Sequence, residues 1–218
     1  LYEAHFGVPM AGMVLNAINY RLDAQTIAYI IDHSDIKMLF VDTEFLSLGE
    51  EAVSLSKKKP NIIIIKDEQT FIFEESYAQM DYEEFLASHD SDFDHYKPLD
   101  EWENLSINYT SGTTGNPKGV VYHHRGAYLN AMGNTLEWDM KMHPTYLWTL
   151  PMFHCNGWCF PWTIAMRAGT NICLRKVTGE SIYEKISSHG VEYLCGAPTV
   201  LSFIINTDAN HVKKLSST

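Results

Sequence analysis

The run Ile62-Ile63-Ile64-Ile65 constrains the fold more than any other segment of the chain. Consecutive β-branched residues favour a strand, and a strand without polar alternation is typical of a sheet that is covered on both faces. Helices that connect parallel strands provide such a cover. The run therefore predicts a buried strand of an α/β sheet.

Strand-like and helix-like segments alternate along the rest of the chain. Apolar runs predict strands at 37–42, 62–65, 105–109, 146–150, 171–174 and 191–195. Helical spacing and capping residues predict helices after the N-cap Asp23 and at about 44–56, 82–87, 125–138, 157–166, 179–188 and 198–205. This alternation is typical of the α/β class, with layered sheets and helices on both faces.

Composition narrows the class of protein. The chain has 218 residues, of which 45% are hydrophobic, and this excludes disordered and fibrous classes. Its net charge of −11 argues against nucleic acid as the main partner. The stretch 67–103 holds 13 of the 27 acidic residues and one base, Lys97. We interpret it as a solvated surface stretch, with an acidic docking surface as the alternative.

Cysteine usage bears on metals and on the compartment. The four cysteines stand at 155, 159, 173 and 195, without a Cys-x-x-Cys pair. His154, Cys155 and Cys159 are soft ligands, but no second ligand pair follows at metal-site spacing. Ordinary buried thiols are therefore favoured over a metal site, and a reducing, cytosolic compartment is expected.

No transmembrane segment is expected. Residues 142–166 carry no Asp, Glu, Lys or Arg, but Pro144, Pro151 and Pro161 interrupt them, which favours a buried strand, loop and helix. The first residues show neither a basic start nor an apolar run, so no signal peptide is expected. The lack of an initiator Met is consistent with a gene that begins further upstream.

The segment 109–120, Tyr-Thr-Ser-Gly-Thr-Thr-Gly-Asn-Pro-Lys-Gly-Val, carries the clearest chemistry. Glycines let the backbone approach a ligand closely, and their amides can form an anion-binding nest. Hydroxyl groups and a lysine suit phosphate oxygens. The sequence therefore predicts a phosphate-binding loop between a strand and a helix. A flexible surface turn is the alternative for a Gly- and Thr-rich segment.

The loop is not a Walker A motif. Counted from Gly112, Pro117 stands where that motif has its second glycine. Gly119 stands where it has the hydroxyl that binds magnesium. A P-loop GTPase or ATPase is therefore disfavoured.

Tyr109–Gly119 resembles the phosphate-binding signature of the adenylate-forming superfamily at every fixed position. That superfamily contains acyl-CoA synthetases, luciferases and the adenylation domains of nonribosomal peptide synthetases. His124-Arg125-Gly126 matches the motif that opens the next helix, although His123 replaces the more usual Ser or Thr.

Three further segments resemble the same family. Leu150–Trp158 is similar to the motif around the acyl pocket of acyl-CoA synthetases and favours a fatty acid ligase over an amino-acid adenylation domain. Gly196–Thr199 resembles a strand-to-helix turn near that pocket. Gly7–Leu22 resembles a structural segment of the family. The likeness is weakest across the acidic stretch.

The resemblance implies a reaction in two halves. A carboxylate, which the family motif identifies as that of a fatty acid, attacks the α-phosphate of ATP and gives an acyl-adenylate and pyrophosphate. A thiol, usually coenzyme A, then displaces AMP. The implied cofactors are ATP, Mg²⁺ and coenzyme A, and the implied partner is a small-molecule carboxylate. Oriented amides and a lysine would stabilise the departing pyrophosphate.

The resemblance also implies roles for particular residues. The catalytic candidates are Lys118 and His154. The residues expected to bind the ATP phosphates are Thr110, Ser111, Gly112, Thr113, Thr114, Gly115 and Lys118. The residues expected to bind substrate are Phe153, His154, Asn156, Gly157, Trp158, Gly196, Ala197 and Pro198. A buried core histidine is the alternative for His154, and plain core packing is an equal alternative for Trp158. No residue is implied as a metal ligand.

Much of the family's machinery is missing from this sequence. It has no Tyr-Gly-x-Thr-Glu string for magnesium and no Thr-Gly-Asp string for the ribose. We therefore expect residues 1–218 to be an incomplete N-terminal adenylation domain without the lid, and inactive alone. A nucleotide-binding module without catalysis is the first alternative. An unrelated α/β domain that binds another phosphate is the second.

Overall fold

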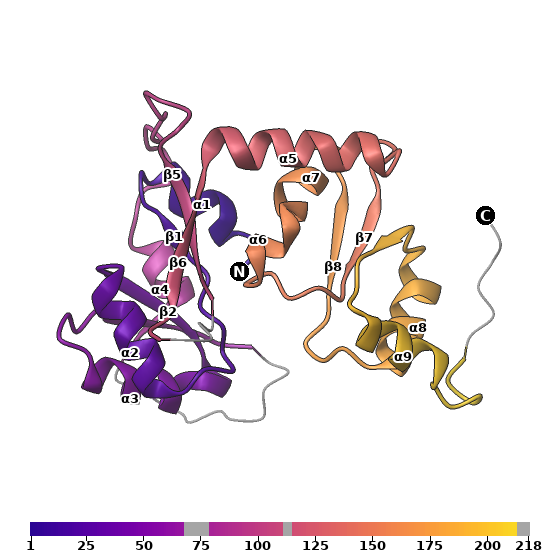
Figure 1. The fold of residues 1–218 in the computed structure, drawn as a ribbon, viewed down its shortest axis with the longest axis horizontal. Coiled ribbons are helices and arrows are strands. Elements are labelled where there is room, and N and C mark those ends of the chain that lie inside the picture. Colours follow the sequence, from indigo (N-terminus) through magenta and orange to yellow (C-terminus); the bar gives the residue numbers. More distant parts are fainter. Residues whose placement is uncertain (68–78, 111–114, 213–218) are drawn as a thin grey trace. The chain divides into compact units, whose positions relative to one another are not determined.

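The computed structural model describes residues 1–67, 79–110 and 115–212, and these residues form two compact units (Figure 1). Unit 1 comprises the described parts of Leu1–Ala17, Tyr96–Asn108 and Val121–Thr218. Unit 2 comprises the described parts of Ile18–His95 and Tyr109–Val120. Each unit has a parallel sheet and a hydrophobic core of its own.

Unit 2 is built on the parallel sheet β2-β3-β4. Its elements are α2 (Ala24–His33), β2 (Met38–Asp42), η1 (Thr43–Phe45), α3 (Leu46–Leu55), β3 (Asn61–Ile65), β4 (Met80–Asp81) and α4 (Tyr82–Ala87). The predicted helix 44–56 is thus divided, because the Asp42 side chain caps a separate short helix at Glu44 N. The predicted cap of α2 is confirmed, since Asp23 accepts a hydrogen bond from Thr26 N at 2.7 Å.

The central strand of unit 2 is covered on both faces, as the isoleucine run predicts. Ile63 and Ile64 point to opposite faces and are 4% and 0% exposed. A cluster from α2 and α3 forms one part of the core, with Ile27, Ile31 and Ala52 at its centre. The burial of Ile63 and Ile64 shows that both faces of β3 are covered at these positions.

Unit 1 carries two three-stranded sheets, in the orders β1-β5-β6 and β8-β7-β9. Its helices are α1 (Ala4–Met10), α5 (His124–Glu137), α6 (Cys155–Trp158), α7 (Phe160–Met166), α8 (Gly179–His189) and α9 (Pro198–Ile205). Its strands are β1 (Leu15–Asn16), β7 (Thr145–Trp148), β8 (Thr170–Cys173) and β9 (Tyr193–Leu194), with most of β5 (Asn104–Thr110) and the end of β6 (Lys118–His123).

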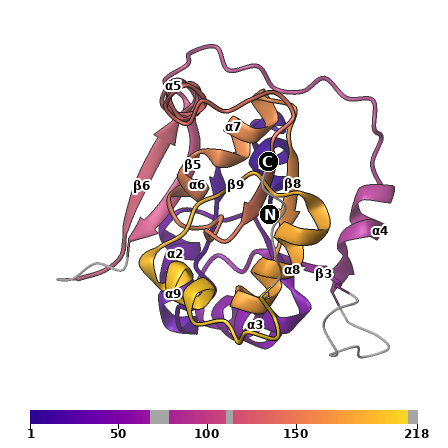
Figure 2. The ribbon, with the colours of Figure 1, turned by 90° about the vertical axis from the view of Figure 1, so that its right-hand side faces the viewer.

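The sheet β8-β7-β9 separates two hydrophobic clusters. On one face Leu147 packs with Ile182 of α8 and Val200 of α9. On the other face Tyr146 and Trp148 pack with residues of α7. Figure 1 shows the strands β7 and β8 between α7 on one side and α8 and α9 on the other, and Figure 2 shows α8 and α9 from the side. The expectation of helices on both faces is therefore confirmed.

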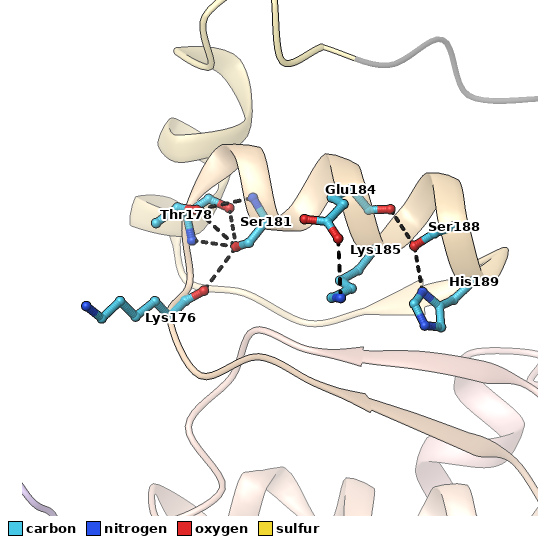
Figure 3. A network of polar contacts seen from close by, with 7 residues as sticks. All are labelled: Lys176, Thr178, Ser181, Glu184, Lys185, Ser188 and His189. Atoms are coloured by element: carbon cyan, nitrogen blue, oxygen red, sulfur yellow. Dashed lines mark hydrogen bonds and ion pairs between the residues drawn. The ribbon is translucent and has the colours of Figure 1, made fainter. Parts of the chain in front are cut away.

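Local polar groups define the ends of α8 (Figure 3). Thr178 and Ser181 form a capping box in which each side chain bonds the backbone N–H of the other. At the other end, Ser188 bonds the His189 ring, and Gly190 ends the helix in a left-handed conformation with φ of +61°. The predicted stop before Gly190 is confirmed.

Two elements differ from the predictions. The strand β6, between the glycine-rich loop and the predicted helix at about 125–138, was not predicted. The predicted helix 157–166 is wrong at its start, because α7 begins at Phe160 after a left-handed turn. None of the helices in the part of the chain that the structure describes has the length and apolarity of a membrane span.

Gly190 and Gly133 form a matched pair for testing the role of backbone conformation in unit 1. Both have open space where a Cβ would lie, but Gly190 has a positive φ and Gly133 is inside α5. Gly190→Ala should destabilise the protein by about 1 kcal/mol, because L side chains disfavour this region. Gly133→Ala should stabilise it by about 0.5–1 kcal/mol. Thermal unfolding measures both changes in stability. Effects of the same sign would contradict the left-handed conformation of Gly190.

His5 should make stability depend on pH. Its side chain is buried against Trp162, and its Nε2 has no hydrogen-bond partner. Burial is the largest cause that lowers the pKa of His5, to about 4. A pKa below the unfolded value of about 6.5 means that stability is fully present above pH 6.5 and falls as the pH drops toward 4.

Wild type should therefore lose about 2 kcal/mol more than His5→Phe between pH 7 and pH 5. Urea unfolding at the two pH values measures this difference. His95→Phe changes an exposed histidine and should retain the wild-type pH dependence. Identical pH dependence in wild type and His5→Phe would show that His5 does not titrate in this range.

Candidate functional site

The predicted phosphate-binding loop joins two neighbouring strands. Thr110 is the last residue of β5, and Lys118 is the first residue of β6. A parallel connection needs about a dozen residues or more, so the short connection from Thr110 to Lys118 indicates an antiparallel pair. Thr110, Gly115 and Lys118 are exposed there. The predicted residues Ser111, Gly112, Thr113 and Thr114 lie outside the described residues.

The described end of the loop is open to a ligand. A Cβ built on Gly115 would meet no atom within 4 Å, so the backbone can be approached closely. Lys118 is exposed on β6, and its ammonium can move on a flexible stem. An accessible backbone and a mobile cation fit a polyanion such as a triphosphate.

Tyr109, which precedes the loop, is anchored within unit 2. The distance between its hydroxyl oxygen and His33 Nδ1 on α2 is 2.6 Å. Burial is the largest cause that raises the pKa of Tyr109. Sequence reasoning missed His33, because 76 positions separate it from Tyr109 and no local pattern links the two.

The segments that contain the predicted substrate residues both begin at one edge of the sheet β8-β7-β9 in unit 1. The strands β7 and β9 are parallel neighbours, with Leu147 opposite Leu194. The segment 150–158 leaves the carboxyl end of β7, and Gly196–Pro198 leaves that of β9. Beyond the paired residues, Thr149 Oγ1 donates to Cys195 O at 2.8 Å.

This edge is also a topological switch point. The chain passes from β7 to β8 on one side and later to β9 on the other. In open α/β sheets, ligands bind at the carboxyl ends of strands where such connections diverge. The segments that contain the predicted substrate residues therefore begin where this fold class binds ligands, and a substrate role for these residues stays a prediction.

The residues at this edge differ in accessibility. His154 is exposed, and its Nε2 lies 3.9 Å from Cys155 Sγ. Trp158 is 52% exposed, so plain core packing is the wrong interpretation for this residue. Phe153 and Gly196 are half-buried, and Ala197 and Pro198 are exposed. A core role is likewise wrong for His154.

Asn156 and Gly157 are buried instead. Asn156 Oδ1 accepts from Ser106 Oγ at 2.8 Å and from Asn108 Nδ2. A Cβ on Gly157 would lie 2.8 Å from Trp148 Cζ3, at a φ of +53°. Trp148 thus already occupies the space beside Gly157, and a role for these two residues in lining an acyl pocket stays a prediction.

The backbone around them is strained. Residues 155–159 all have positive φ, between 42° and 63°. The left-handed conformation costs about 1–2 kcal/mol for each residue that is not glycine. Hydrogen bonds to Asn156 offset part of this cost, as does Asn134 Nδ2, which donates to Trp158 O at 2.9 Å. Such strain persists only where surrounding contacts hold it.

The cysteines near this turn are free thiols. Burial raises the pKa of Cys159, and burial followed by the nearby Cys155 and Cys159 raises the pKa of Tyr122 to about 12. Cys173 is exposed, so the interpretation as buried thiols is wrong for that residue. Within the described ranges, no group of three or more His, Cys, Asp or Glu residues could hold a metal ion.

Comparison with known proteins identifies the family. The model of the AMP-binding enzyme family matches residues 1–218. The chain belongs to the AMP-binding enzyme family. This confirms the resemblance of its phosphate-binding signature to the adenylate-forming superfamily.

Two curated relatives illustrate the similarity. The AMP-binding chain is 48% identical over 217 residues to a peroxisomal acetate/butyrate–CoA ligase of Arabidopsis thaliana. It is 42% identical over 230 residues to a peroxisomal trans-cinnamate:CoA ligase of Petunia hybrida. The alignments cover 94% and 99% of the chain but 38% and 40% of these relatives. The chain thus spans about two-fifths of their length.

A solved structure confirms the fold. ATP-bound MatB from Rhodopseudomonas palustris superposes with a TM-score of 0.77 at 17% identity. The match covers 97% of this AMP-binding chain and 41% of MatB. The predicted α/β architecture of an adenylate-forming N-terminal domain is therefore present.

Gly157→Ala should test the packing behind the substrate edge. The added methyl group would clash with Trp148 and strain a positive φ, so we expect a loss of about 2–4 kcal/mol in stability. Trp148→Phe shortens the ring that causes the clash. Denaturant unfolding should show that the double variant loses less than the sum of the single variants. Strict additivity would rule out this contact.

Proposed function

We propose that the protein containing this chain is an AMP-forming acid–CoA ligase, and that residues 1–218 form part of its N-terminal adenylation domain. The observation that carries the proposal is the complete signature Tyr109–Gly119 within a chain that matches the AMP-binding enzymes throughout. The curated relatives named above are both acid–CoA ligases.

In the proposed reaction, the chain's loop binds the polyphosphate of ATP. A substrate carboxylate attacks the α-phosphorus, the bond to the bridging oxygen breaks, and pyrophosphate leaves. Thr110, the loop and Lys118 supply hydrogen-bond donors and positive charge to the β- and γ-phosphates. Coenzyme A then attacks the acyl carbon through its sulfur, and AMP leaves. A carboxylate is a poor electrophile. Its acyl carbon becomes reactive in the adenylate because AMP is a good leaving group.

Magnesium would neutralise charge on the polyphosphate in this reaction. The described residues of this chain offer no cluster of three or more candidate ligands. The glutamate-containing string that the family resemblance associates with magnesium does not occur in the sequence. We therefore assign no magnesium ligand to this chain.

His154, Phe153 and the turn Gly196–Pro198 form the proposed substrate edge. The exposed imidazole of His154 can donate a hydrogen bond to a carboxylate or adenylate oxygen. Trp148 fills the space beside Gly157, which supports a short acid rather than a long fatty acid. The named substrates of the relatives, acetate, butyrate and trans-cinnamate, are also short or planar acids.

The compartment and the partners stay predictions. Cysteine usage suggests the cytosol, whereas both relatives are named as peroxisomal. The acidic net charge continues to argue against nucleic acid as a partner. A nucleotide-binding module without catalysis remains the second candidate.

Exchange of labelled pyrophosphate into ATP tests the proposal on the full protein. We expect exchange that depends on added acid, with butyrate or cinnamate supporting faster exchange than palmitate. Lys118→Ala should slow exchange by roughly tenfold to a thousandfold, since it removes a charge that stabilises the departing phosphates. Lys57→Ala, which changes another lysine of unit 2, should exchange at the wild-type rate.

The same experiment separates the alternatives. ATP binding without exchange under any acid would favour the nucleotide-binding module. Exchange by wild type with palmitate as the best acid would overturn the short-acid specificity alone. An unchanged ATP affinity in Lys118→Ala would overturn the proposed role of Lys118 in binding the phosphates.

A further inference from the structure

Three polar side chains form a hydrogen-bonded cluster inside unit 1, in which Asn156 meets Ser106 and Asn108 of the distant strand β5. Asn156 Nδ2 is buried and has no hydrogen-bond partner. Asn156 and Ser106 are 0% exposed, and Asn108 is 7% exposed. Asn156 Oδ1 accepts two hydrogen bonds, from Ser106 Oγ and Asn108 Nδ2. In return, the Asn156 backbone N–H donates to Asn108 Oδ1 at 3.3 Å. Buried polar groups carry a desolvation cost that only such mutual bonding offsets.

The cluster links the two segments that the sequence singled out. Ser106 and Asn108 lie on β5, and the two-residue period of a strand places Thr110 on the same face. Thr110 is the first of the residues expected to bind phosphate. On the other side, Asn156 stands two residues after His154, inside the left-handed turn. One amide thus ties the turn that follows His154 to the part of strand β5 that belongs to unit 1.

Asparagine suits this position for two separate reasons. It tolerates the left-handed conformation better than other residues with a side chain, and here its φ is +42° and its ψ is +50°. Its carbonyl oxygen also holds both β5 donors at once. Glycine would meet the first requirement without the second, so a substitution can separate conformation from hydrogen bonding.

We propose that Asn156 is a positioning residue for the adenylation half-reaction. It holds the segment of Phe153 and His154, which precedes the left-handed turn, at a fixed position relative to strand β5. This inference rests on the proposed ligase function. Because Asn156 is fully buried in this chain, we expect it to act through the turn. A reaction between two bound groups is sensitive to displacements of about 1 Å, so loss of this register should slow catalysis.

Asn156→Gly tests the proposal in the full protein by pyrophosphate exchange. We expect kcat to fall roughly tenfold to a hundredfold, with the KM for ATP changed by less than about threefold. Asn108→Ala should give a similar loss, and the double variant should lose no more than the larger single effect. Asn134→Ala removes a hydrogen bond from α5 to the same turn and leaves the bonds to β5 intact. It should lower kcat by less than about threefold.

A second measurement is independent of activity. Hydrogen exchange of a peptide spanning residues 151–160 should accelerate in Asn108→Ala, since the Asn156 N–H loses its acceptor. Circular dichroism should show native secondary structure in each variant. A variant that fails this check is replaced by Ser106→Ala, which removes one donor to Asn156.

The outcomes separate the inference from the function on which it rests. No exchange by the wild-type protein with any acid overturns the proposed function, and with it the role of Asn156. Wild-type exchange with an unaffected Asn156→Gly overturns only the inference. So does a loss confined to the KM for ATP, an equal loss in Asn134→Ala, or unchanged hydrogen exchange.

Discussion

Parallel pairing of β7 with β9 is the constraint on which the candidate substrate edge depends. Parallel neighbours must be joined by a crossover, so the chain leaves every strand at the same edge of the sheet. The segments after Trp148 and Leu194 are therefore brought together although 46 positions separate Thr149 from Cys195. The helices that make these crossovers also bury both faces of the sheet. One arrangement thus supplies the core and the site.

Polar contacts define the positions of segments that hydrophobic packing alone does not define. Burial of Tyr146, Leu147 and Trp148 stabilises the sheet but is not directional. The Thr149 bond to Cys195 O and the Asn156 cluster impose distances and angles on the segments that leave it. Because an unmade bond in these places would leave a buried group without a partner, each contact favours a single geometry. A site that needs defined positions benefits from such contacts at its base.

Much of the fold follows from local patterns in the sequence. The isoleucine run, the cap at Asp23, the stop at Gly190 and the helix that opens at Pro198 all agree with the structure. These features depend on a residue and its close neighbours, which a sequence displays directly. The short strands β1 and β4 and the strand β6 escaped prediction, because pairing with distant segments, more than local propensity, defines them. The helix at 157–166 was misplaced because its left-handed start carries no distinctive periodicity.

The sequence by itself determined the family, since the eleven consecutive residues of its signature are readable without coordinates. It also determined the α/β class, because the alternation of apolar runs permits little else. Tertiary structure alone decided that His154 and Trp158 are accessible while Asn156 and Gly157 are buried. Adjacent residues of one motif have opposite environments because the left-handed turn directs Asn156 toward β5 and packs Gly157 against Trp148. That difference arises from contacts between remote segments, which no local pattern encodes.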